Sequence, residues 1–186
     1  MHEKEHVLEI LRETRNALHK RDVIKLRSLS NETIHSASIY KDTDSIMLAV
    51  ILYSLGKIIE RQNGGKVKGC DEFCKKASLF LEKALASLNA NNTKEFSRNL
   101  EGIIKSINTL SPELKNYVRD VFEKAKINKA SKIYEHGISL GKTAEILGIT
   151  MWDVANYAGA KGVTDVSLTK TQDVKTRIKL AMDFFK

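Results

Sequence analysis

One stretch, residues 46–59 (IMLAVILYSLGKII), constrains the fold more than any other, because it is apolar nearly all round and carries a single charge, Lys57. A helix with this pattern must be covered on every side. Its most apolar part, residues 46–55, has only about half of the ~20 residues that a bilayer span requires. We therefore expect the central helix of a bundle, which begins at Thr43 or Asp44 and ends near Arg61.

The composition favours helices throughout the chain. Its 186 residues include one proline and ten glycines, and no run of alternating Val, Ile or Thr indicates a sheet. The two cysteines are too few for a disulfide framework, and the N-terminus, MHEKEHVLEI, lacks the basic start and apolar run of a secretory signal. The sequence thus predicts an all-α protein, cytoplasmic and with reduced thiols, that is not embedded in a membrane.

Amphipathic spacing and capping residues divide the chain into further helices. Asp22 and Thr93 are expected N-caps, and Ser111 followed by Pro112 is a clear helix start. The predicted helices cover residues 3–20, 23–29, 30 or 31 to 40, 71–88, 93–107, 112–134 and, from Thr171 or Gln172, the C-terminal end. The helix from Pro112 would connect an N-terminal helical bundle (about residues 1–110) to a C-terminal unit (about residues 111–186).

Within that C-terminal unit, residues 140–159 (LGKTAEILGITMWDVANYAG) have the layout of a helix-turn-helix. Ala144 is small enough for two helices to approach, and Gly148 can take the left-handed conformation that ends a helix. The second helix is expected to start at Thr150. The apolar side chains expected to lock the two helices together are Leu147, Ile149, Val154 and Tyr157.

Three other motifs resemble enzyme signatures. HEKEH, residues 2–6, matches a zinc-protease pattern, but it lies in the first turn of the chain, where no cleft can flank it. GISLGKT, residues 137–143, is one residue short of a phosphate-binding loop and follows a helix, so Gly137 more simply ends that helix and Ser139 caps the next. Arg12 and His19 have the spacing of a ribonuclease pair, although on the first helix. We expect no enzyme, cofactor or metal site.

The net charge of +8 and the pI of about 9.4 favour an anionic partner, nucleic acid first. The excess is divided evenly between residues 1–110 and 111–186, and residues 140–159 carry one lysine against two acidic residues. Phosphate contacts must therefore come largely from flanking lysines. The residues predicted to face the ligand are Lys142, Thr150, Trp152 and Asn156, with Lys129, Lys132 and Lys161 on phosphates. Asn156 is the strongest base reader among them.

Residues 138–166 resemble the small prokaryotic antitoxin-like helix-turn-helix proteins, in which an AAELxGxSxWE-type core precedes a short helix and a glycine-containing loop. The residues that match in kind are Thr143, Ala144, Glu145, Leu147, Gly148, Trp152 and Asp153. The resemblance implies DNA binding, often by a dimer and sometimes together with a partner protein. Met151 departs from the pattern, because a polar or basic residue is more usual there.

These observations predict a non-enzymatic nucleic-acid-binding protein, and a DNA-binding transcription regulator of antitoxin-like type as its leading form. The N-terminal bundle would form a homodimer or bind a partner. Two alternatives stay open. One is an RNA- or ribosome-associated factor that binds through basic faces spread over the chain. The other is a protein-interaction module in which Met151 and Trp152 form an apolar anchor.

Overall fold

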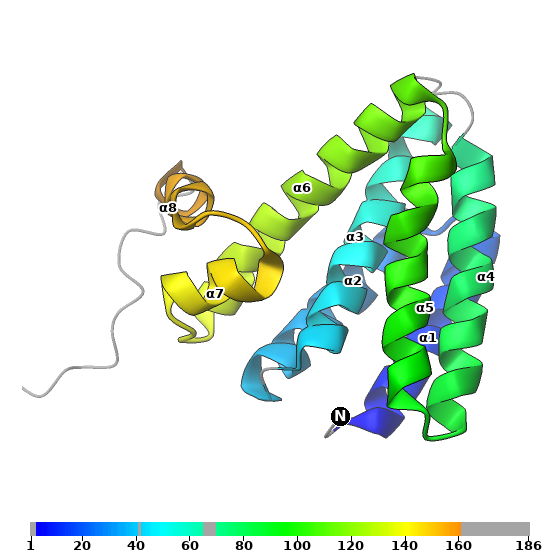
Figure 1. Ribbon diagram of the computed structural model, residues 1–186, viewed down its shortest axis with the longest axis horizontal. Coiled ribbons are helices and arrows are strands. Elements are labelled where there is room, and N and C mark those ends of the chain that lie inside the picture. Colours follow the sequence, from blue (N-terminus) through cyan, green and yellow to red (C-terminus); the bar gives the residue numbers. More distant parts are fainter. Residues whose placement is uncertain (1–2, 41, 65–69, 161–186) are drawn as a thin grey trace, which may run out of the picture.

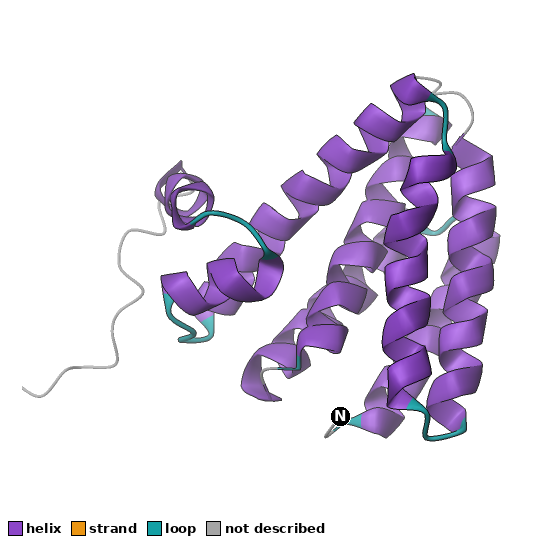
Figure 2. Ribbon diagram, viewed as in Figure 1, coloured by secondary structure: helices purple, strands orange, loops and turns teal. Residues whose placement is uncertain are grey.

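The computed structural model describes residues 3–40, 42–64 and 70–160. These residues form eight α-helices and one 3-10 turn, residues 107–109, and contain no strand (Figure 2). The prediction of an all-α protein is confirmed. The helix predicted from residue 171 or 172 lies outside the described residues. No helix in the described ranges combines the length and the apolar character that a membrane span requires.

Five helices make up the bundle: α1 (Lys4–Lys20), α2 (Val23–Tyr40), α3 (Thr43–Asn63), α4 (Cys70–Asn89) and α5 (Thr93–Ser106). As predicted, the apolar stretch lies at the centre, because α3 packs against α2, α4, α5 and α6. The apolar α3 side chains that are shielded completely from solvent are Leu48, Ala49, Ile51, Leu52, Leu55 and Ile58. Burial of aliphatic side chains on every face of α3 thus holds the bundle together, at about 1.5–3 kcal/mol for each side chain.

Helix α2 is one continuous helix, and the predicted break near Ser30 and Asn31 is wrong. Serine and asparagine favour helix starts because their side chains can accept hydrogen bonds from free backbone N–H groups. Here the Ser30 hydroxyl instead donates to the carbonyl of Ala49 on α3, at 2.6 Å. A buried tertiary hydrogen bond therefore replaces the expected cap, and the serine joins two helices.

The other helix starts follow from local capping. The Asp22 carboxylate accepts from the backbone N–H of Lys25 at 2.9 Å, as predicted, and Asp42 caps α3. Thr93 is not the cap of α5. The preceding residue, Asn92, accepts from the N–H of Glu95 at 3.0 Å, so the helix begins at Thr93 itself.

Helix α6 (Pro112–Glu135) leaves one end of the bundle and runs diagonally across α3 (Figure 1). The two short helices α7 (Leu140–Leu147) and α8 (Met151–Ala160) pack against its far end. Because α6 contacts both α3 and the α7–α8 pair, it fixes the position of the pair relative to the bundle.

Candidate nucleic-acid interface

The turn between α7 and α8 forms as the sequence predicts. The Ser139 hydroxyl accepts from the backbone N–H of Lys142 at 3.3 Å and caps α7. Gly148 ends α7 with φ +61°, and the Ile149 N–H that follows donates to the Ala144 carbonyl at 3.1 Å. A Cβ at Gly148 would meet nothing within 4 Å, so the backbone conformation, and not space, requires glycine there.

Thr150 and Asp153 form a reciprocal cap at the start of α8. The Thr150 N–H donates to the Asp153 carboxylate at 3.1 Å, and the Asp153 N–H donates to the Thr150 hydroxyl at 3.1 Å. The same hydroxyl donates to that carboxylate at 2.6 Å, and these hydrogen bonds from Thr150 lower the pKa of Asp153. Thr150 is exposed, as a ligand contact requires, but its hydroxyl is already used to cap α8.

One face of α8 is buried against α6 and α7 through Val154, which is fully shielded from solvent. Ala144 and Leu147 of α7 and Ile133 of α6 belong to the same apolar cluster. The side chain of Tyr157, another predicted contact, lies outside the described part of the chain. These few small contacts fix which face of α8 points outward.

The outward face of α8 carries Met151, Trp152 and Asn156, with Met151 55% and Trp152 77% exposed. Met151 leans back over α7, because its sulfur would lie 3.5 Å from a Cβ placed on Gly141. Among the described side chains of α8, Trp152 is thus the most exposed large one. Asn156, one turn further on, is also exposed.

Lys129 does not belong to this surface, and its predicted phosphate contact is wrong. Its side chain is fully buried, donates to the Asn31 amide oxygen at 2.9 Å and places its Nζ 4.7 Å from the centre of the Tyr53 ring. Burial, and to a smaller extent the charge of Lys132, lowers the pKa of Lys129 to about 8. This lysine therefore joins α6 to α2 and α3 and is not available to an external phosphate.

The other predicted lysines differ in their surroundings. Lys132 is exposed on α6. Lys142 is half-exposed on α7, where its ammonium pairs with the Glu145 carboxylate at 2.9 Å. Lys161 lies outside the described residues. Among the described residues, the predicted site thus brings together Trp152, Asn156, Thr150 and a lysine that a neighbouring carboxylate partly neutralises.

A histidine pair near this unit could not be found from the sequence. His35 of α2 and His136, just after α6, lie with their ring nitrogens Nδ1 and Nε2 3.1 Å apart, although 101 residues separate them in the chain. Two carboxylates that follow His35 in the chain have other roles, because Asp42 caps α3 and Asp44 accepts from the Ser97 hydroxyl. Among the described residues, no three His, Cys, Asp or Glu side chains gather in a way that could hold a metal ion.

Comparisons with protein families, with characterised proteins and with solved structures found no match to this chain.

Proposed function

We propose that the protein is a non-enzymatic DNA-binding regulator in which α6, α7 and α8 form a helix-turn-helix and α8 is the recognition helix. The observation that carries the proposal is the division of α8 into two faces. Val154 is buried against α6 and α7, whereas Trp152 and Asn156 near its N-terminal end face solvent. A recognition helix reads base edges with the outward residues of this part.

The residues of this face suit different parts of a duplex. Asn156 has the amide that can contact an adenine edge with two hydrogen bonds, and Trp152 offers apolar contact to a thymine methyl or a sugar. Lys132, Lys142 and Lys161 would contact phosphates. The bundle formed by α1–α5 would support a dimer or a partner protein, since dimers of this kind place two recognition helices on one DNA face.

The charges near α8 limit the electrostatic share of binding. Asp153 and Glu145 are both close to the outward face, and Lys129 is buried. With about three phosphate contacts, log Kd should change with log salt concentration by a slope of roughly 2–3. A steeper slope would indicate that basic residues elsewhere in the chain take part.

The test is a fluorescence anisotropy titration of the full chain with a mixed-sequence DNA duplex over a series of salt concentrations. We expect affinity that falls as salt rises, and a loss of about tenfold or more for Trp152→Ala and for Asn156→Ala on a selected site. Lys83→Gln, an exposed lysine on α4, is the matched control and should bind as wild type. An absence of binding at low salt, or equal binding by Trp152→Ala and wild type, refutes the proposal. Stronger binding to single-stranded RNA would favour the RNA-associated alternative.

A second candidate, a protein-docking role, is favoured by the apolar character of the same face. Met151 and Trp152 are two of the five large hydrophobic side chains that the described residues expose. Tryptophan is enriched among residues that dominate protein interfaces. In this case the wild-type protein would copurify with one partner protein in a stoichiometric complex that withstands high salt and nuclease treatment. Trp152→Ala would abolish this copurification. Copurification of nucleic acid in an amount that falls as the salt concentration rises would argue against the protein-docking role.

A further inference from the structure

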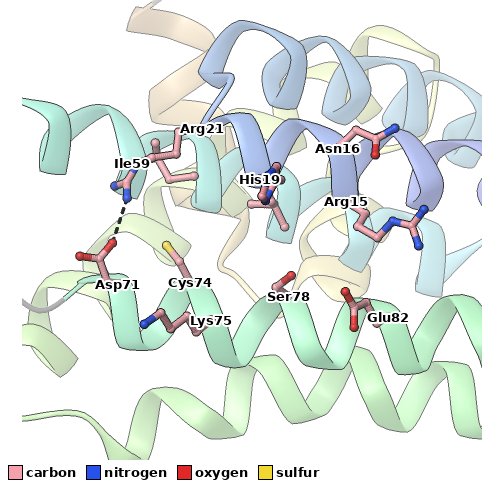
Figure 3. A pocket seen from close by; sticks show the side chains of 11 residues that line it. Arg15, Asn16, His19, Arg21, Ile59, Asp71, Cys74, Lys75, Ser78 and Glu82 are labelled. Atoms are coloured by element: carbon pink, nitrogen blue, oxygen red, sulfur yellow. Dashed lines mark hydrogen bonds and ion pairs between the residues drawn. The ribbon is translucent and has the colours of Figure 1, made fainter.

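A cleft of about 540 Å³ lies between α1 and α4 (Figure 3). Both helices belong to the bundle, and α8 lies apart from them (Figure 1). The two helices run in opposite directions along the cleft. Arg21, just after α1, meets Asp71 of α4 at one end, where the guanidinium and carboxylate pair at 2.9 Å, and Arg15 lies toward Glu82 at the other end (Figure 3). The cleft volume falls within the roughly 300–1,000 Å³ of small-molecule sites.

Basic side chains line the cleft on both helices. Arg15 and His19 are four residues apart and share one face of α1, and Lys75 lies on α4 across the cleft, next to Cys74 (Figure 3). Within the described part of the chain, none of these three side chains has a hydrogen bond or ion pair, whereas Arg21 is held by both Asp71 and Gln62. Arg15 and His19 both line the cleft, whereas Arg12, with which the spacing of His19 suggested a ribonuclease pair, does not line it.

The floor between these basic side chains is uncharged. It consists of Leu18, Ile59 and the Cys74 thiol. Burial raises the pKa of Cys74 to about 12, so its thiol stays neutral and adds no negative charge there. The Asp71 carboxylate also lines the cleft, but it is paired with Arg21. An anion that enters the cleft thus meets basic side chains on two walls and an uncharged floor.

The end of the cleft near Arg15 has a different character. Asn16 and Glu82 lie there, and in the described residues Glu82 has no hydrogen bond or ion pair (Figure 3). A carboxylate can only accept hydrogen bonds, so it selects a ligand group with N–H or O–H donors. Seven residues of helix separate Lys75 from Glu82, which corresponds to about 10 Å along α4. The cleft therefore offers an anion site and a site for hydrogen-bond donors, separated by a distance that one small ligand can span.

We propose that this cleft binds a guanosine monophosphate-like ligand, with its phosphate between His19 and Lys75 and its guanine ring at the Arg15–Glu82 end. Guanine has adjacent N–H donors, on its ring and its exocyclic amine, that a Glu82 carboxylate can accept together. On its other edge it has the O6 and N7 acceptors that an arginine contacts with two hydrogen bonds. Adenine lacks the ring N–H and is therefore the weaker ligand. The proposal does not depend on DNA binding by α8.

The test is isothermal titration of the full chain with guanosine monophosphate, adenosine monophosphate, guanosine and inorganic phosphate. We expect saturable binding of guanosine monophosphate that exceeds the binding of the other three. Lys75→Gln should weaken both nucleotides by about tenfold, the worth of one charge-assisted hydrogen bond. Glu82→Gln should weaken guanosine monophosphate and leave adenosine monophosphate unchanged. Lys83→Gln, one residue further along α4 and outside the cleft, should bind as wild type.

Several outcomes overturn the assignment. No saturable binding of guanosine monophosphate, or an unchanged Kd in Lys75→Gln, removes the ligand from this cleft. Equal affinity for inorganic phosphate shows an anion site with no nucleoside recognition. Lys75 and Glu82 are both exposed, so their substitution should leave the fold intact. A chemical-shift titration that places the changes on α1 and α4 provides a second measurement. None of these results bears on DNA affinity, which is measured separately.

Discussion

Substitution of Lys129 by Met should stabilise the protein. Lys129 is fully buried, and its ammonium donates to the neutral amide oxygen of Asn31, so within the described part of the chain no carboxylate pairs with its charge. Folding lowers the pKa of Lys129 from 10.5 to about 8. At ~1.4 kcal/mol for each pKa unit, the folded state loses about 3 kcal/mol in keeping this ammonium charged. Met fills the space of the stem without the charge.

The pH dependence distinguishes this explanation from a packing effect. Below pH 8, Lys129 is protonated in both the folded and the unfolded state, so the full penalty is present. As the pH rises from about 8 to 10.5, the folded state loses its proton before the unfolded state does, and the penalty disappears. The stability advantage of Lys129→Met should therefore be about 3 kcal/mol at pH 7 and fall toward zero near pH 10.5.

Urea denaturation followed by circular dichroism at several pH values measures this difference. Comparison of the two proteins at each pH cancels the contribution of other groups, including Cys74, whose raised pKa makes the folded state less stable as the pH rises above 9. Lys124→Met is the matched control on α6. It removes an exposed ion pair with Asp120 and should change stability by less than about 1 kcal/mol. A Lys129→Met protein that is less stable than wild type at pH 7, or a difference that does not vary with pH, refutes the reasoning.

Three further changes test individual features of the fold. Gly148→Ala should cost about 1 kcal/mol in thermal denaturation, because φ +61° strains any residue with a Cβ; equal stability would contradict a fixed left-handed turn. Gly102→Ala should cost roughly 1–3 kcal/mol, because its Cβ would overlap the Phe80 ring, and Phe80→Leu in the same chain should restore part of the loss. The Cys74 thiol should react slowly with iodoacetamide at pH 8 in the folded state and rapidly in urea, since burial raises its pKa to about 12.

Most of the fold could be predicted because helix starts and apolar spacing are local signals. The start of α6 at Ser111 and Pro112 and the end of α7 at Gly148 require only neighbouring residues, and both were predicted where they occur. The break predicted in α2 failed at Ser30, because its hydroxyl bonds to Ala49, 19 residues away. Such a partner depends on how helices pack and has no signature in the local sequence.

The site was less predictable because exposure, and not residue type, decides which lysines reach a ligand. Lys124, Lys126, Lys129 and Lys132 form a basic run in the sequence, yet Lys129 is buried and the ammonium groups of Lys124 and Lys126 pair with carboxylates on α6. One periodic signal does separate Lys129 from the others. The buried side chains of α6 include a series at three- and four-residue intervals, at Val118, Phe122, Ala125, Lys129 and Ile133. A lysine on such a stripe points into the core whatever its neighbours in the sequence are. The stripe therefore predicts the surroundings of a lysine better than its place in a basic run does.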